Sequence, residues 1–278
     1  MIASVEAYPR RTMNPVEPIA DPSPEVRELW RGLLTGTMPV YRDARRWLKH
    51  LPGSPRCEFC AAPFRGLFVP LMRQMGRGEW HRNRRYCGKC FALLENARGG
   101  AEIECSLLFA DVRGSTSLAE QMPSAEFRHL LDRFYRAAAE IFVEQDGILD
   151  KFVGDEVIAI FIPALVQDAH AARAVAAARA VLKATGHGQP GGPWLPVGAG
   201  VASGVAYVGA VGAAHVEFTA LGDIVNTAAR LAGAAGQGEI LLTMPAAERA
   251  NLQMAGIERR LLALKGKAER VEVAVLHG

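Results

Sequence analysis

The chain has 278 residues, half of them hydrophobic, so it can bury a sizeable core and is not disordered throughout. Its formal charge of +3 is unevenly distributed. Residues 1–100 hold 17 Lys and Arg against 9 Asp and Glu (+8), whereas residues 101–278 hold 15 against 20 (−5). The basic residues are scattered among expected turns and helices, so we interpret them as a solvated surface and do not expect nucleic acid as a partner.

No apolar segment has the length of a membrane helix, which needs about 20 residues. The longest apolar run, Val157 to Val166, is short and contains Pro163. The N-terminus has no continuous apolar segment and resembles neither a signal peptide nor an anchor. The sequence therefore predicts a cytoplasmic protein without a membrane span.

The first hundred residues predict a tail followed by a small helical module. Residues 1–22 are rich in proline and lack periodicity, which is typical of a disordered tail. Ser23 followed by Pro24 predicts a helix start, and a second amphipathic helix is expected from Tyr41 to Leu51. Gly99-Gly100 indicates a linker. The predicted divisions are a tail over 1–22, a helical and cysteine-containing module over 23–100, and a larger domain over 101–278.

The larger domain alternates between strand and helix periods. Ser106 to Val112 predicts a strand and Ser124 to Val143 a helix, and two further strands flank the tight turn Gly154-Asp155. The remaining expected elements are a helix over 167–184, a Gly-rich strand pair within 197–211, a helix over 223–232, and strands near Ile240, Arg260 and Val271. This order favours an α+β fold of the ferredoxin-like, palm type over a doubly wound sheet.

Two aspartates occupy positions that this fold makes neighbours. Asp111 lies near the end of the first strand, and Asp155 lies in the hairpin turn between the next two. Their carboxylates would repel each other at one sheet edge, and a divalent cation usually offsets such repulsion. The segment after Asp111 opens a helix whose free N–H groups suit a triphosphate. A single aspartate in a turn is otherwise an ordinary turn former.

Three stretches, LLFADVRGSTSLAE, GILDKFVGDEVIAIF and FTALGDIVNTAARL, resemble the signature stretches of class III nucleotidyl cyclases, and the resemblance covers about residues 101–278. It implies that Asp111, Asp155 and the carbonyl of Val112 bind two Mg²⁺ or Mn²⁺ ions. It also implies that Asn226 orients the ribose and that Arg230 stabilises the transition state.

The same resemblance assigns the substrate contacts and predicts an adenylate cyclase that converts ATP to cyclic AMP and pyrophosphate. Lys151 and Thr219 match the base-selecting residues, and Lys265 matches the lysine that binds the terminal phosphates. A lysine suits adenine because adenine offers an acceptor at N1 and a donor at N6, and guanine reverses both. Thr219 replaces the commoner aspartate, which resembles the bicarbonate-responsive subclass and leaves a guanylate cyclase as an alternative.

The resemblance also predicts a homodimer. In this family the base-binding and arginine residues of one subunit face the metal-binding aspartates of the other, and this chain carries one complete set. Two copies should therefore form two equivalent sites across a two-fold interface, and a monomer should be inactive. A sensor that binds a partner or nucleic acid through residues 23–100 remains the alternative main role.

Four of the five cysteines form two Cys-x-x-Cys pairs, which in the cytoplasm favours metal ligation over disulfides. Cys57 and Cys60 are separated from Cys87 and Cys90 by 26 residues, a spacing that resembles a zinc ribbon. Four thiolates suit a structural tetrahedral Zn²⁺, and an iron–sulfur cluster or free thiols are the alternatives. We interpret the fifth cysteine, Cys105, as a buried filler.

Overall fold

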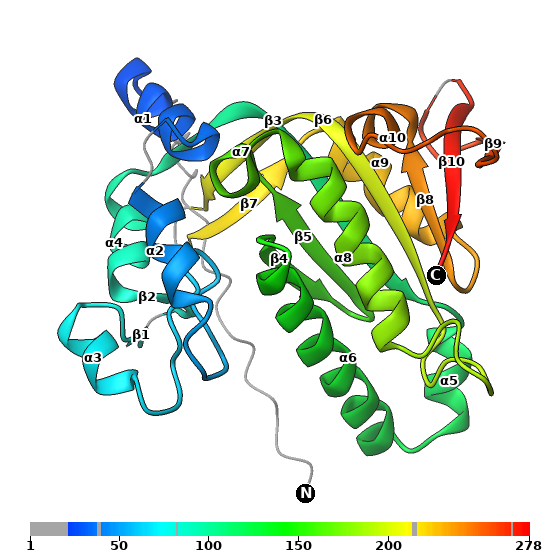
Figure 1. The fold of residues 1–278 in the computed structure, drawn as a ribbon, viewed down its shortest axis with the longest axis horizontal. Helices are drawn as coiled ribbons and strands as arrows, with labels where there is room; N and C mark the ends of the chain where they lie inside the picture. The colour runs from blue at the N-terminus through cyan, green and yellow to red at the C-terminus, as the bar shows by residue number, and fades with distance from the viewer. Residues whose placement is uncertain (1–21, 38–39, 82, 213–215, 268) are drawn as a thin grey trace, which may run out of the picture.

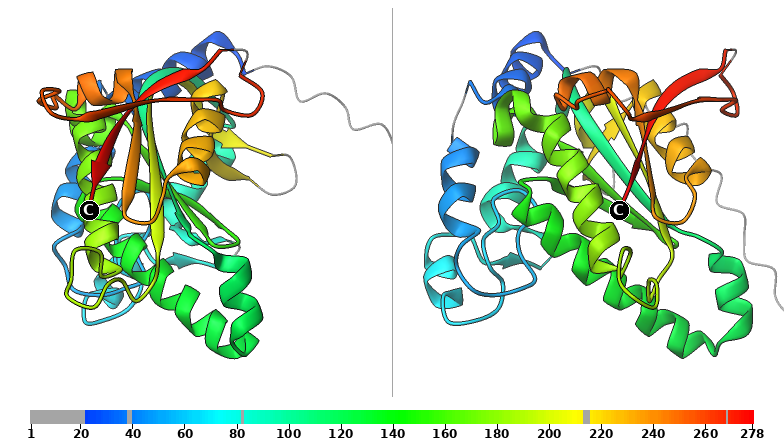
Figure 2. Two further views of the ribbon diagram at one scale, coloured as in Figure 1. Left: turned by 90° about the vertical axis from the view of Figure 1, so that its right-hand side faces the viewer. Right: turned by 45° about the vertical axis from the view of Figure 1, so that its right-hand side comes forward.

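The computed structural model describes residues 22–37, 40–81, 83–212, 216–267 and 269–278 (Figures 1 and 2). Almost all of the predicted N-terminal tail lies outside these ranges. Among the described residues, no helix combines the length and the apolar character that crossing a membrane requires. Both figures place the N-terminal elements at one end of the molecule and the last three strands at the other.

The N-terminal part is mainly helical and ends in a small two-stranded sheet with a following helix. Its first helix begins where the sequence predicts, because the Ser23 side chain accepts a hydrogen bond from the Val26 N–H at 3.4 Å. Gly36 ends this helix in the left-handed conformation that glycine adopts without strain. The elements are α1 (Pro24–Thr35), α2 (Val40–Leu48), α3 (Val69–Gln74), β1 (Glu79–Trp80), β2 (Asn83–Cys87) and α4 (Gly88–Asn96).

One eight-stranded sheet forms the centre of the protein, in the order β4-β5-β3-β6-β8-β10-β9, with β7 paired to β6. Neighbouring strands are antiparallel except for the parallel pair β6–β8. The strands are β3 (Gly99–Val112), β4 (Ile148–Val153), β5 (Glu156–Phe161), β6 (Val197–Val211), β7 (Glu217–Leu221), β8 (Glu239–Thr243), β9 (Glu258–Leu262) and β10 (Val271–His277).

The two longest strands form the spine of this sheet. β3 and β6 pair continuously from Gly99 opposite Ala210 to Val112 opposite Val197. The expected strand pair within 197–211 is therefore wrong, because this segment is one strand. Its glycines allow close packing rather than a turn: a Cβ on Gly200 would lie 2.4 Å from the Ala228 carbonyl oxygen.

The two faces of β3 bury alternate residues against different helices, as the two-residue period of a strand requires. Leu108 and Ala110 pack in a core with α6 and α8, which lie side by side in Figure 1. Leu107 and Phe109 pack in a second core with α9. The helices of this domain are α5 (Ser115–Gln121), α6 (Ser124–Glu144), α7 (Pro163–Val166), the 3-10 turn η1 (Gln167–Ala169), α8 (His170–Ala184), α9 (Asp223–Ala234) and α10 (Met244–Arg249). This arrangement confirms the predicted α+β fold of ferredoxin-like type.

The N-terminal part shares the second core with the sheet. Trp30 of α1 stacks on Phe218 of β7 with ring centroids 6.3 Å apart, and Phe59 meets the same ring edge-on at 4.8 Å. The expected linker at Gly99-Gly100 is instead the start of β3. A Cβ on Gly100 would lie 2.5 Å from the Val208 carbonyl oxygen, so these glycines serve close strand packing rather than flexibility.

Candidate active site and cysteine cluster

The two predicted metal-binding aspartates lie close together at one end of the spine. Asp111 is the penultimate residue of β3 and Asp155 lies in the turn between β4 and β5. The Val112 N–H donates to the Asp155 carbonyl at 3.4 Å, which ties the turn to the strand end. Burial raises the pKa of Asp111 to about 6, an increase that Arg113 opposes and the negative charge of Asp155 enhances.

A third carboxylate joins this pair, which sequence reasoning missed. Glu156 lies opposite Asp111 in the β3–β5 register, so both side chains share one face of the sheet. Burial, followed by the charges of Asp111 and Asp155, raises the pKa of Glu156 to about 7. Such crowded oxygens suit a hard divalent cation. In the described structure Arg113 supplies the positive charge instead, through an ion pair with Asp111.

Three of the predicted substrate residues line one cavity of about 710 Å³, on the face of the sheet that α9 covers. Lys151 comes from β4, Thr219 from β7 and Asn226 from α9. Phe109 contributes to the same wall. Because Phe109 and Asp111 are two residues apart on β3, their side chains lie on the same face of the sheet, although Asp111 is not among the described residues that line this cavity.

The base-selecting candidates form a chain of hydrogen bonds with Asp150. The Lys151 Nζ donates to the Thr219 hydroxyl at 3.2 Å, and that hydroxyl donates to an Asp150 carboxylate oxygen at 3.1 Å. Asp150 is buried, and burial raises its pKa while Lys151 opposes the rise. The sequence did not point to Asp150, because strict alternation would turn it away from Lys151. The register shift between Leu149 and Lys151 brings both side chains to Thr219.

The remaining two candidates, Arg230 of α9 and Lys265 of the loop after β9, form a separate group. Arg230 lies one helical turn after Asn226 and beside the loop that follows β9. A Cβ on Gly266 would lie 3.2 Å from the Arg230 Nη2, so the guanidinium contacts this turn closely. Lys265 precedes that glycine and is exposed. One chain thus brings together the base residues, the carboxylates, and the Arg230–Lys265 pair as three adjacent groups.

The four cysteines of the N-terminal part converge as their spacing predicts. All four sulfur atoms are buried and lie within 4.8 Å of one another. The Cys60 and Cys87 sulfurs are 3.7 Å apart. This separation agrees with the distance of about 3.8 Å between thiolates that tetrahedral Zn²⁺ with bonds of about 2.3 Å requires. The donor set therefore fits a tetrahedral metal. Cys105 lies apart in the core, where burial raises its pKa to about 12 and keeps the thiol neutral.

The sheet carries paired aspartates at the end of its spine and, on the face that α9 covers, a cavity lined by Lys151. Residues 101–278 match the family model described as the adenylate and guanylate cyclase catalytic domain, and the chain belongs to this family. Domains of this family are lyases that make cyclic nucleotides with divalent metal ions.

Solved cyclases share the fold of this domain. The adenylyl cyclase CyaB from P. aeruginosa is 28% identical, with a TM-score of 0.55 over 64% of this chain and 96% of that chain. The guanylyl cyclase Cya2 is 25% identical, with a TM-score of 0.56 over 64% and 93%. Structures of both specificities are thus similar to this chain.

Curated relatives match a shorter part. The adenylate cyclase of Anabaena cylindrica is 30% identical over 152 residues, which cover 50% of this chain and 29% of that protein. An uncharacterized protein of Mycobacterium tuberculosis is 36% identical over 134 residues, covering 48% and 24%. The matches thus span about a quarter of the length of these relatives.

Proposed function

We propose that the chain is an adenylate cyclase that converts ATP to 3′,5′-cyclic AMP and pyrophosphate as a homodimer. The observation that carries this proposal is the direction of the hydrogen bonds from Lys151 through Thr219 to Asp150. The carboxylates of Asp111 and Asp155 would meet the phosphates of a nucleotide whose base lies in the cavity of the partner chain.

The hydrogen-bond order favours adenine over guanine. A threonine hydroxyl alone can donate or accept, but here its proton is directed to Asp150, so its oxygen faces the cavity as an acceptor. The acceptor suits the N6 amino group of adenine, and the ammonium of Lys151 suits the N1 acceptor. Guanine presents a carbonyl and an N–H at these two positions and would leave both contacts unsatisfied.

The other candidates have roles that follow from their charge and position. Asp111, the Val112 carbonyl and Asp155 would hold two Mg²⁺ or Mn²⁺ ions, whose Lewis acidity lowers the pKa of the attacking hydroxyl and polarises the phosphates. Asn226 holds the ribose in the cavity. Arg230 offsets the negative charge that grows on the α-phosphate, and Lys265 binds the departing pyrophosphate.

We infer the homodimer from the family pattern, in which the base-binding residues and Arg230 of one chain face the metal-binding aspartates of the other. Asp111 and Asp155 are not among the described residues that line the base cavity of their own chain. A two-fold partner would bring a second set of carboxylates to the base cavity and would complete two equivalent sites. A single chain should therefore be inactive.

We further propose that residues 23–100 form a module with one structural Zn²⁺ at Cys57, Cys60, Cys87 and Cys90. Four thiolates saturate a tetrahedral ion and leave no open position for chemistry. Elemental analysis should find about one zinc per chain. Iron with acid-labile sulfide would contradict zinc and support the iron–sulfur alternative, and four freely titrating thiols in anaerobic protein would contradict both.

Product analysis tests the proposed reaction. Purified protein should form cyclic AMP from ATP with Mg²⁺ or Mn²⁺, and should use GTP at least about tenfold less efficiently because both polar contacts to the base would be unsatisfied. Equal or greater cyclic GMP formation would favour the guanylate cyclase alternative.

Since Thr219 resembles the threonine of the bicarbonate-responsive subclass, we also propose bicarbonate as an activator. Added bicarbonate at constant pH should raise the rate, whereas equal chloride should not.

A further inference from the structure

The strand that carries Lys151 is held from outside by the N-terminal part of the chain. β4 is the first strand of the sheet order, so one side of its backbone is not paired with another strand. Carbonyl groups on such an edge need other donors or water. In β4 and the residue before it, two arginines from residues 23–100 supply these donors.

Arg85 of β2 makes the contacts nearest to the base cavity. Its Nη2 donates to the Leu149 carbonyl at 3.2 Å and also to the Asp150 carbonyl. Asp150 is the residue whose side chain accepts the Thr219 proton. The guanidinium thus holds the backbone of one base-cavity residue, while its Nη2 and its Nε each also contact the Glu58 carboxylate at 2.8 Å.

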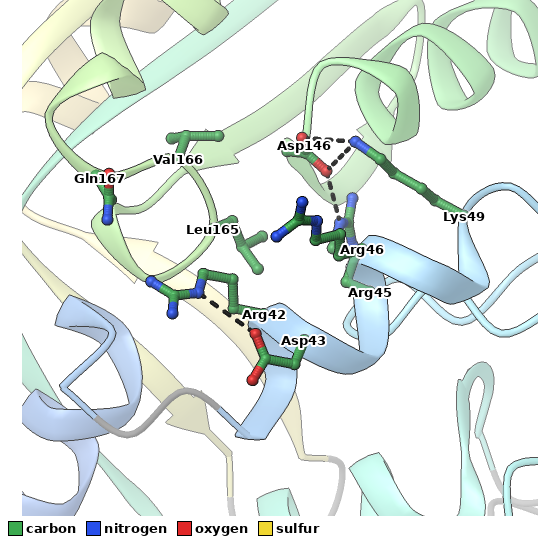
Figure 3. A pocket seen from close by; sticks show the side chains of 9 residues that line it. All are labelled: Arg42, Asp43, Arg45, Arg46, Lys49, Asp146, Leu165, Val166 and Gln167. Carbon is green, nitrogen blue, oxygen red and sulfur yellow. Dashed lines mark hydrogen bonds and ion pairs between the residues drawn. The ribbon is translucent and has the colours of Figure 1, made fainter.

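Arg45 of α2 makes a similar contact just before β4. Its side chain is buried and donates to the Gly147 carbonyl at 2.6 Å. It also donates to the carbonyls of Glu58 at 2.7 Å and Phe59 at 3.0 Å. Figure 3 shows the neighbouring Asp146 between Arg45 and Lys49, with the Lys49 Nζ 2.8 Å from a carboxylate oxygen.

Both arginines are anchored on the cysteine cluster. Arg85 lies two residues before Cys87, and its partner Glu58 directly follows Cys57. The Glu58 N–H donates to the Arg85 carbonyl at 3.0 Å, so the ion pair is also closed through the backbone. Each cysteine pair therefore carries one half of the Arg85–Glu58 ion pair, and a metal bound by all four sulfurs would fix the two halves together.

We propose that Arg85 is a positioning residue for nucleotide recognition, through which the cysteine cluster sets the geometry of Asp150, Thr219 and Lys151. The inference rests on the proposed assignment of Lys151 and Thr219 to the base. It makes the N-terminal part a determinant of substrate selectivity: the Nε and Nη2 of one guanidinium together contact a carboxylate and two carbonyls, and a lysine has no second nitrogen to share these contacts.

The test compares Arg85→Lys with the matched control Arg84→Lys, in which the neighbouring and largely exposed arginine is changed. Both variants are assayed as full-length protein for kcat and KM with ATP and with GTP, together with metal content and melting temperature. Arg85→Lys should lower the ratio of kcat/KM for ATP over GTP about tenfold, with metal retained. Arg84→Lys should leave the ratio unchanged.

If Arg85 had a merely structural role, its substitution would lower kcat/KM equally for ATP and GTP. An unchanged ratio of the two values in metal-loaded Arg85→Lys therefore overturns the proposal. If this variant does not fold, Glu58→Gln combined with Arg85→Gln removes both charges and is judged by the same ratio. Wild-type protein without cyclase activity would instead overturn the proposed function.

Discussion

The two ends of the candidate site differ in how far a single chain completes them. At the base end, Lys151, Thr219 and Asp150 are already joined by hydrogen bonds. At the carboxylate end, burial and mutual repulsion raise the pKa of Asp111 and of Glu156, and Arg113 pairs with one of the acids. In the proposed function, base recognition therefore depends on one chain, whereas catalysis also requires divalent cations and a second chain.

The largest effect should come from the carboxylate end. Asp155→Asn should lower cyclic AMP formation more than about a thousandfold, because a proposed ligand of both cations is lost. The melting temperature of the metal-free protein should not fall, since the change removes a charge that repels Asp111. Asp132→Asn, at an exposed position on α6, is the control and should remain active. Substantial turnover by Asp155→Asn at saturating Mn²⁺ would show that the carboxylate end does not bind the catalytic ions.

Mixing inactive variants tests whether the two ends meet across chains. Asp111→Asn protein mixed with Arg230→Ala protein should recover about a quarter of the wild-type rate, because half of the dimers are mixed and one of their two sites is intact. The measurement needs evidence of subunit exchange, such as a mass difference detected in isolated dimers. No recovery despite exchange would mean that each chain contains a self-contained site.

A smaller effect is expected at the base end. Asp150→Asn should lower the preference for ATP over GTP about tenfold, because an amide can donate to Thr219 and free the hydroxyl proton for the guanine carbonyl. Thr219→Ser keeps the hydroxyl and serves as the control that retains selectivity. An unchanged ratio in Asp150→Asn would show that the direction of this hydrogen bond does not decide the base.

The smallest effect concerns His187, which contacts the strand that pairs with the carboxylate end of β3. The His187 Nε2 accepts the Val197 N–H at 3.1 Å, and Val197 lies opposite Val112. Burial lowers the pKa of His187, so the unfolded chain takes up a proton near pH 6.5 that the folded chain resists, and stability falls as the pH drops below that value. His187→Gln should reduce the loss of melting temperature between pH 7 and pH 5 by a few degrees, whereas exposed His129→Gln should not. Identical pH profiles would rule out this role.

Sequence patterns located the proposed catalytic and substrate-binding residues better than the residues that position them. The sequence predicted three site residues, Asp111, Asp155 and Lys151, because each lies in a short local motif. The strand pairing that brings the two aspartates together followed from the predicted fold. Asp150 was hidden by a bulge that breaks the alternation of β4. Arg85 was hidden because it contacts residues more than sixty positions later in the chain.

The glycines misled the sequence analysis for a related reason. Gly99 and Gly100 were interpreted as a linker, and the Gly-rich segment of β6 as a pair of strands. Both sets lie inside long strands, where backbone or side-chain atoms of a neighbouring element occupy the space that a side chain would need. Such close contacts depend on tertiary packing, which local periodicity does not record.

The shared ring of Phe218 has a consequence for the order in which the protein is made. Trp30 and Phe59 both pack on this residue of β7, although they leave the ribosome long before it does. The N-terminal part therefore cannot close its core while it is the only segment synthesised. The packing around Phe218 can be completed only after β7 has emerged, so residues 23–100 do not finish folding before this later segment has been translated.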